Sequence, residues 1–125
     1  MTEIVLEFGR RPPSVNGGHG NRYQKAATTK LWRTLGRSVM QEAINEGRAP
    51  RHAEVVTITA QQLAKHGGGH QDLGNALPAV KAIEDGIVDT GFIPDDTPAH
   101  VVRLSFIPPD ACGRDGLRVY IGIVG

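Results

Sequence analysis

The sequence predicts a small α+β domain, in which two helices pack on one mixed sheet. Two stretches have the apolar spacing of helices, and four others have the composition of strands. The chain has 125 residues, 39% of them hydrophobic and 22% charged, which suits one hydrophobic core rather than two. We therefore expect residues 1–125 to form a single domain, with its elements in the order β-α-β-α-β-β.

The strands are predicted from alternating and β-branched residues. Residues Glu3–Phe8 alternate, with Ile4 and Leu6 on one side. Val55–Ala60 is rich in β-branched residues and also alternates. The remaining two strands are expected at Val101–Ile107 and Leu117–Val124.

The first helix is expected from about Ala26 to Asn45, with Thr28 or Thr29 as its cap. We expect Trp32 to lie in the core, as tryptophans near amphipathic helices commonly do. The apolar stripe of this helix is predicted at spacings of three, four and seven and comprises Leu31, Leu35, Val39, Met40 and Ala43.

The second helix is expected from Asn75 to Thr90, with Asn75 as a plausible cap. Pro78 is compatible with it because a proline in the first turn removes no helical hydrogen bond. Asp85 and Asp89 are expected on its solvated face. Its apolar stripe comprises Leu77, Val80, Ile83 and Ile87.

Acidic turns flank this second helix. Asp72 stands just before it, and Pro94-Asp95-Asp96 follows it. If the two turns fold back towards each other, three carboxylates converge, and such oxygen ligands suit Mg²⁺ in phosphoryl-transfer sites. Each acidic residue also has a plain structural interpretation, because aspartates favour helix N-termini and turns.

The net charge of +1 conceals an uneven distribution. Residues 1–60 hold nine basic and five acidic residues, a net charge of +4, whereas residues 61–125 hold five and eight, a net charge of −3. The basic half is either a solvated face or a surface for the phosphates of nucleic acid. The candidate DNA-binding residues are Arg10, Arg11, Asn16, Arg22, Lys25, Lys30, Arg33 and Arg37.

The sequence has no apolar run of the length that crosses a bilayer, and MTEIVLEF lacks the pattern of a signal peptide. We therefore expect a cytoplasmic protein that does not bind membranes. Cys112 is the single cysteine, which excludes an internal disulfide and a multi-cysteine zinc site.

Three motifs occur in an order that is typical of one known family. Pro12-Pro13-Ser14-Val15-Asn16 is similar to a PPS-x-N opening, and Asp72-Leu73-Gly74-Asn75 is similar to a D-L-D-N motif. Gly91-Phe92-Ile93-Pro94-Asp95-Asp96 is similar to A-G-x-x-x-D-D. Over most of its length the chain thus resembles the RusA-like Holliday junction resolvases, endodeoxyribonucleases of bacteria and their phages.

The resemblance implies a homodimer that binds four-way DNA junctions and cuts two strands symmetrically with Mg²⁺ or Mn²⁺. It implies that Asp72 and Asp96 are catalytic, and that the metal ligands are Asp72, Asp96 and the neighbouring Asp95. It also implies that Lys81 is the catalytic lysine.

Two positions depart from the family pattern. Gly74 stands where the family has its second aspartate, and Pro78 stands where it has its lysine. Lys81 lies three residues further on and keeps the family's spacing to Asp85; three residues turn a helix by about 300°, so it returns near the same face. Because Gly74 lacks a carboxylate, a second hypothesis is a protein that binds branched DNA with weak or no cleavage. A third hypothesis is a protein that keeps only the fold and does not bind nucleic acid.

Overall fold

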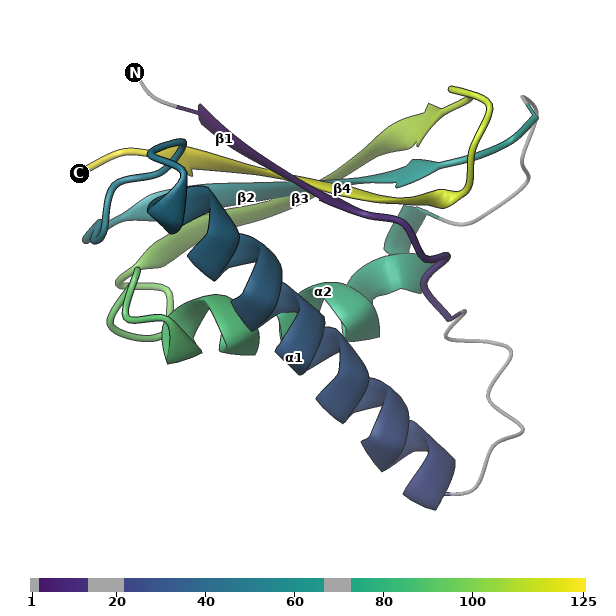
Figure 1. The fold of residues 1–125 in the computed structure, drawn as a ribbon, viewed down its shortest axis with the longest axis horizontal. Coiled ribbons are helices and arrows are strands. Elements are labelled where there is room, and N and C mark those ends of the chain that lie inside the picture. Colours follow the sequence, from purple (N-terminus) through teal and green to yellow (C-terminus); the bar gives the residue numbers. More distant parts are fainter. Residues whose placement is uncertain (1–2, 14–21, 67–72) are drawn as a thin grey trace.

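A computed structural model describes residues 3–13, 22–66 and 73–125, with the side chains of Arg22 and Leu73 left undescribed. Figure 1 shows one sheet with both helices beneath it. The predicted α+β class and element order are confirmed. In chain order the elements are β1 (Glu3–Phe8), α1 (Arg22–Asn45), β2 (Val56–Leu63), the short 3-10 helix η2 (Leu73–Ala76), α2 (Leu77–Asp89), β3 (Val101–Asp110) and β4 (Gly116–Ile123).

The four strands form a mixed sheet in the order β1-β4-β2-β3. β4 runs antiparallel to both of its neighbours, β1 and β2, whereas β2 and β3 are parallel. A parallel pair needs a crossover connection, and the segment containing α2 supplies it. The crossover keeps α2 on the same face of the sheet as α1 (Figure 1).

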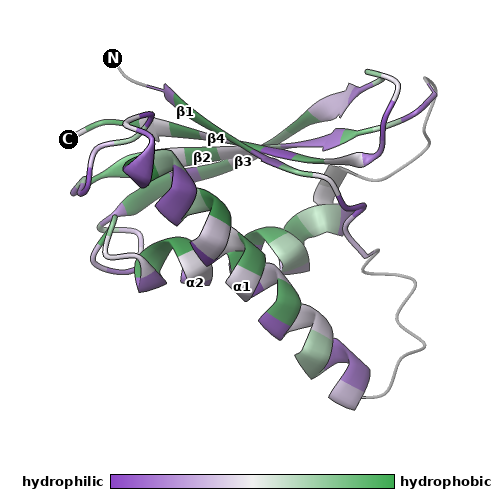
Figure 2. Cartoon of the chain, viewed as in Figure 1, coloured by the Kyte–Doolittle hydropathy of each residue, from purple (hydrophilic) through white to green (hydrophobic). Residues whose placement is uncertain are grey.

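Alternation along the strands buries one face of the sheet. In β1 the inward residues are Ile4, Leu6 and Phe8, all of which are buried. The ring of Phe8 lies 5.9 Å from the ring of Trp32 on α1, which joins the helix to the edge strand. Figure 2 shows hydrophobic residues along α2 and through the middle of the sheet.

α1 starts four residues earlier than expected, and its buried side is rotated from the predicted stripe. Leu31 was predicted to face the core, but its side chain is 37% exposed, whereas Trp32 is only 2% exposed. The prediction was wrong at Leu31 because both residues fit a helical spacing, and the larger ring takes the place beside Phe8. The expected burial of Trp32 is confirmed.

The two helices cross at a pair of glycines. A Cβ placed on Gly86 of α2 would lie 2.2 Å from the carbonyl oxygen of Arg33 and 2.6 Å from the amide nitrogen of Arg37. A Cβ placed on Gly36 of α1 would lie 2.8 Å from the Cα of Ile83. The backbones therefore touch, and only glycine fits at either position.

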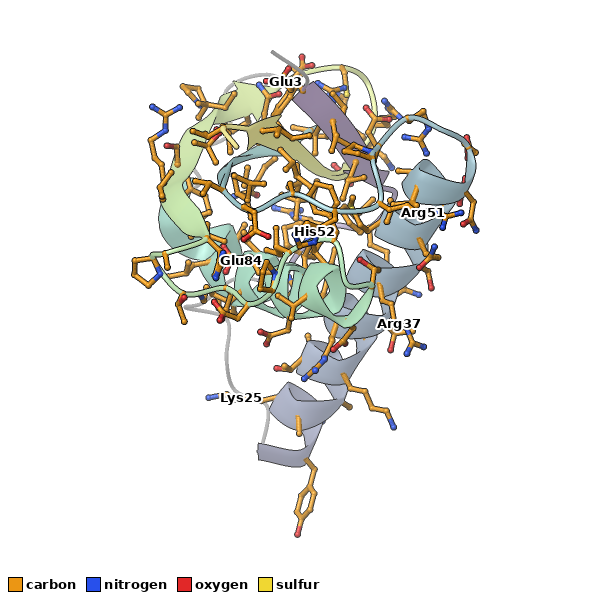
Figure 3. All side chains as sticks on the ribbon, turned by 90° about the vertical axis from the view of Figure 1, so that its left-hand side faces the viewer. Glu3, Lys25, Arg37, Arg51, His52 and Glu84 are labelled. Atoms are coloured by element: carbon orange, nitrogen blue, oxygen red, sulfur yellow. The ribbon has the colours of Figure 1, made fainter. Side chains whose placement is uncertain are left out.

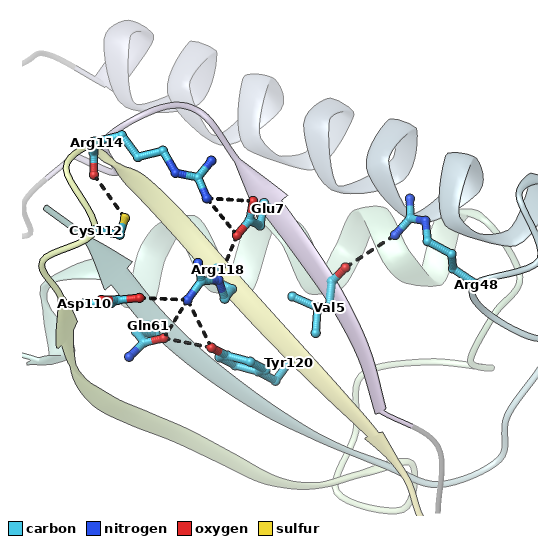
Figure 4. A network of polar contacts seen from close by, with 9 residues as sticks. All are labelled: Val5, Glu7, Arg48, Gln61, Asp110, Cys112, Arg114, Arg118 and Tyr120. Atoms are coloured by element: carbon cyan, nitrogen blue, oxygen red, sulfur yellow. Dashed lines mark hydrogen bonds and ion pairs between the residues drawn. The ribbon is translucent and has the colours of Figure 1, made fainter. Parts of the chain in front are cut away.

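The other face of the sheet carries a polar network centred on Arg118 (Figure 4). Its Nε donates to the Glu7 carboxylate at 2.8 Å, and its Nη1 donates to Asp110 at 3.1 Å and to Gln61 at 3.3 Å. The hydroxyl of Tyr120 donates to the same Gln61 oxygen at 2.8 Å. Because these residues come from four different strands, the network ties the whole width of the sheet together.

None of the helices in the described part of the chain has the length and apolar character needed to cross a membrane.

Candidate functional site

The chain doubles back along α2 after that helix ends. Gly91 has a φ of 82°, a conformation that glycine adopts readily, and it follows the C-cap Thr90. Phe92 and Ile93 are buried and anchor the returning segment in the core. The return spans the eight residues from Asp89 to Lys81, roughly 12 Å of helix, and brings the Pro94-Asp95-Asp96 turn beside the first half of α2.

This return brings together two of the predicted catalytic residues. The ammonium Nζ of Lys81 lies 3.6 Å from the Oδ2 of Asp96. It also donates a 2.9 Å hydrogen bond to the carboxylate of Glu84, one helical turn further along α2. The contact with Glu84 is the main reason that the pKa of Lys81 is raised, so Lys81 is a firmly charged cation in this cluster.

Glu84 is the residue in this cluster that sequence analysis missed. Its side chain is 1% exposed, and Figure 3 shows it on α2. Burial raises its pKa, and this effect exceeds the opposing attraction of Lys81. A buried carboxyl was not predictable, although Lys81 and Glu84 have the spacing of a helical ion pair.

Asp85 was expected on the solvated face of α2, and that expectation was wrong. Its side chain is only partly exposed, and its pKa is raised first by burial and then by the nearby negative charge of Asp96. We name the group formed by Lys81, Glu84, Asp85 and Asp96 the α2 acidic cluster.

Asp95 points into its own turn. Its carboxylate accepts hydrogen bonds from the amide and the hydroxyl of Thr97, the amide at 2.9 Å, and these bonds lower its pKa. The Nε2 of His100 lies 4.0 Å from the Oδ1 of Asp95. Asp95 therefore shapes the loop that carries Asp96 and is not joined to Lys81 by any contact seen in the described residues.

The remaining predicted ligand, Asp72, lies outside the described residues, as does Asn16. Asn75 does not cap α2: Ala76 holds that position without a side-chain hydrogen bond, because Leu73–Ala76 forms η2. Within residues 3–13, 22–66 and 73–125, no group of three or more His, Cys, Asp or Glu side chains is arranged to hold a metal ion.

The predicted DNA-binding residues have different surroundings. Arg33 makes a two-point ion pair with Asp89 of α2, with distances of 2.7 and 2.8 Å, and thereby lowers the pKa of that carboxyl. This guanidinium thus braces α1 against α2. The side chains of Arg10, Arg11, Lys25, Lys30 and Arg37 are exposed.

Replacing Glu84 by glutamine is expected to remove a pH dependence of stability. Because the pKa of Glu84 is raised above its ordinary value of 4.5, the folded chain holds this proton more tightly than the unfolded chain does. The free energy of unfolding of the wild type should therefore exceed that of Glu84→Gln by the largest amount below pH 4.5. This difference should shrink as the pH rises through the raised pKa of Glu84. Urea unfolding of both proteins between about pH 4 and 8 measures the difference, and a constant difference would contradict the prediction.

No family model matches this chain, and a search of curated proteins finds no significant match.

Proposed function

We propose that this protein is a metal-dependent, structure-selective endodeoxyribonuclease that acts on four-way DNA junctions as a homodimer. The observation that supports this proposal most strongly is the α2 acidic cluster, in which Lys81 lies beside Asp96. Those two residues are 15 positions apart, and both match motif positions in the resemblance to RusA-like resolvases. A chance arrangement of surface charges would not be expected to bring together the two residues that match the family motifs.

The chemistry of the donor set suits a divalent cation. The Asp85 carboxyl lies close enough to Asp96 for the negative charge of Asp96 to raise its pKa, and hard oxygen ligands of this kind are what Mg²⁺ and Mn²⁺ prefer. Asp85 thus supplies the carboxylate that Gly74 lacks. We propose that Asp96, Asp85 and Asp72 hold the metal, which when bound supplies an acidified water and offsets charge on the phosphate.

Lys81 is the fixed positive charge of the proposed site. Its raised pKa keeps the ammonium protonated, and the bond to Glu84 restricts its position. A positioned cation stabilises the negative charge that develops on a phosphodiester during hydrolysis. Its long side chain is half exposed, so a bound phosphate can approach the ammonium from solvent.

Symmetric incision of a two-fold junction requires two related sites, which is the reason for proposing a homodimer. The direct test is incubation of the pure protein with a labelled synthetic four-way junction and Mg²⁺ or Mn²⁺. Paired nicks on opposite strands support the proposal. Tight junction binding without any nicking contradicts the enzymatic part of it.

Gly74 favours a second candidate function, a branched-DNA-binding protein with weak or no cleavage. Gly74→Asp separates the two, because Gly74 has no positive φ and an aspartate can adopt its conformation. If Asp85 already completes the site, we expect Gly74→Asp to change the cleavage rate by less than about tenfold, or 1.4 kcal/mol in the barrier. Cleavage that appears only in the variant would favour the second function. The rate on a labelled junction is the measurement.

A further inference from the structure

The first three turns of α1 form a helical arm that buries no side chain against the rest of the domain. Residues 23–31, which we name the α1 arm, contain no buried side chain, whereas Trp32, Met40 and Ala43 are buried further along the same helix. Figures 1 and 3 show this end of α1 standing clear of the sheet and of α2.

The charge of this part of α1 has one sign. The α1 arm contains two basic residues, Lys25 and Lys30, and no acidic residue, and the first turn of the helix has no acidic side chain. Basic residues near a helix start oppose the macrodipole, and short helices without packed faces are marginal in water. A partner that neutralises positive charge would therefore stabilise the α1 arm.

The arrangement of side chains around the helix axis fits a phosphate backbone. At 100° per residue, Lys25 and Lys30 are about 140° apart, and they flank a face on which the α1 arm carries Ala26 and Thr29. Small side chains between two cations let the helix approach a charged surface closely. The exposed ring of Tyr23 lies at the N-terminal end of the α1 arm, with 75% of its surface accessible.

We propose that the α1 arm is the surface by which this protein lies along the phosphates of duplex DNA, with Lys25 and Lys30 on either side of Ala26 and Thr29. The choice of DNA as the polyanion rests on the proposed function, but the contact itself requires no cleavage. Arg33 is not part of this contact, because its guanidinium is held by Asp89. Lys25 and Lys30 are thus the binding pair of α1, whereas Arg33 braces α1 against α2.

The test is a double variant, Lys25→Ala with Lys30→Ala, measured by fluorescence anisotropy on a labelled junction and a labelled linear duplex in EDTA. Loss of two phosphate contacts should reduce the slope of log K against log salt by roughly two. The loss should be equal on both DNAs, since phosphate contacts carry no information on sequence. Amide hydrogen exchange over residues 23–31 of the wild type should slow when duplex DNA is added.

The matched control is Arg51→Ala with Arg103→Ala, which removes the same charge from exposed positions off the α1 arm. Figure 3 shows Lys25 and Arg51 towards opposite ends of α1. The control should keep the wild-type salt slope. An unchanged slope in the arm variant, an equal loss in the control, or no DNA binding by the wild type overturns the inference. Binding that depends on the arm in a protein that never nicks DNA overturns only the proposed enzymatic activity.

Discussion

Gly86→Ala is expected to destabilise the protein by at least about 2 kcal/mol, although alanine is the better helix former by about 1 kcal/mol. The new methyl group would lie 2.2 Å from the carbonyl oxygen of Arg33, so α1 and α2 must move apart. Separation would loosen the Arg33–Asp89 ion pair and the packing of Ile83 at the same crossing. Urea unfolding measures the change in the free energy of unfolding.

Gly9→Ala is the matched control for this prediction. A Cβ at Gly9 meets nothing within 4 Å, and the residue follows β1, away from the helix crossing. The control should change stability by less than about 0.5 kcal/mol, as surface substitutions usually do. A Gly86→Ala protein as stable as the wild type would show that the two helices do not touch at this point.

Asp96→Asn is expected to reduce cleavage of a four-way junction by at least about 100-fold, the usual scale for loss of one essential charged group. An amide is a poor ligand for a hard cation, and the substitution also removes the negative charge beside Lys81. Single-turnover cleavage rates at saturating protein measure the effect. Junction affinity should not fall, because removing an anion does not weaken binding to a polyanion.

Asp95→Asn tests whether Asp95 only shapes the turn that carries Asp96 or also takes part in the reaction. An asparagine keeps an oxygen that can accept the hydrogen bonds from Thr97, so the loop should retain its shape. We expect this variant to lose less than about tenfold in rate. Equal losses at Asp95 and Asp96 would mean that both carboxylates act in the reaction.

The fold was largely predictable from periodicity, because both helices and all four strands have clear spacing. The strand ends were less so: β3 continues to Asp110 through Pro108 and Pro109, residues that usually end a strand. Pairing was not predictable either. Nothing in the local sequence places β4 between β1 and β2, since strand order depends on contacts between distant segments.

The candidate site was predictable in part. The resemblance selected Lys81 and Asp96, which the structure brings within 3.6 Å of each other. Glu84 and Asp85 were missed because a helix pattern assigns charged residues to the solvated side. Here α2 is covered by α1 on one side and by the returning chain on another, so Glu84 is buried and Asp85 is partly buried.

The sheet topology also determines when this fold can be completed. Among the described strands, β1 pairs only with β4, so Glu3 finds its partner in Gly122 near the other end of the sequence. During synthesis, β1 and the facing edge of β2 remain unpaired until β4 has emerged from the ribosome and inserted between them. Closing so long a loop must precede the pairing of β1 with β4, so we expect the insertion of β4 to limit the rate of folding.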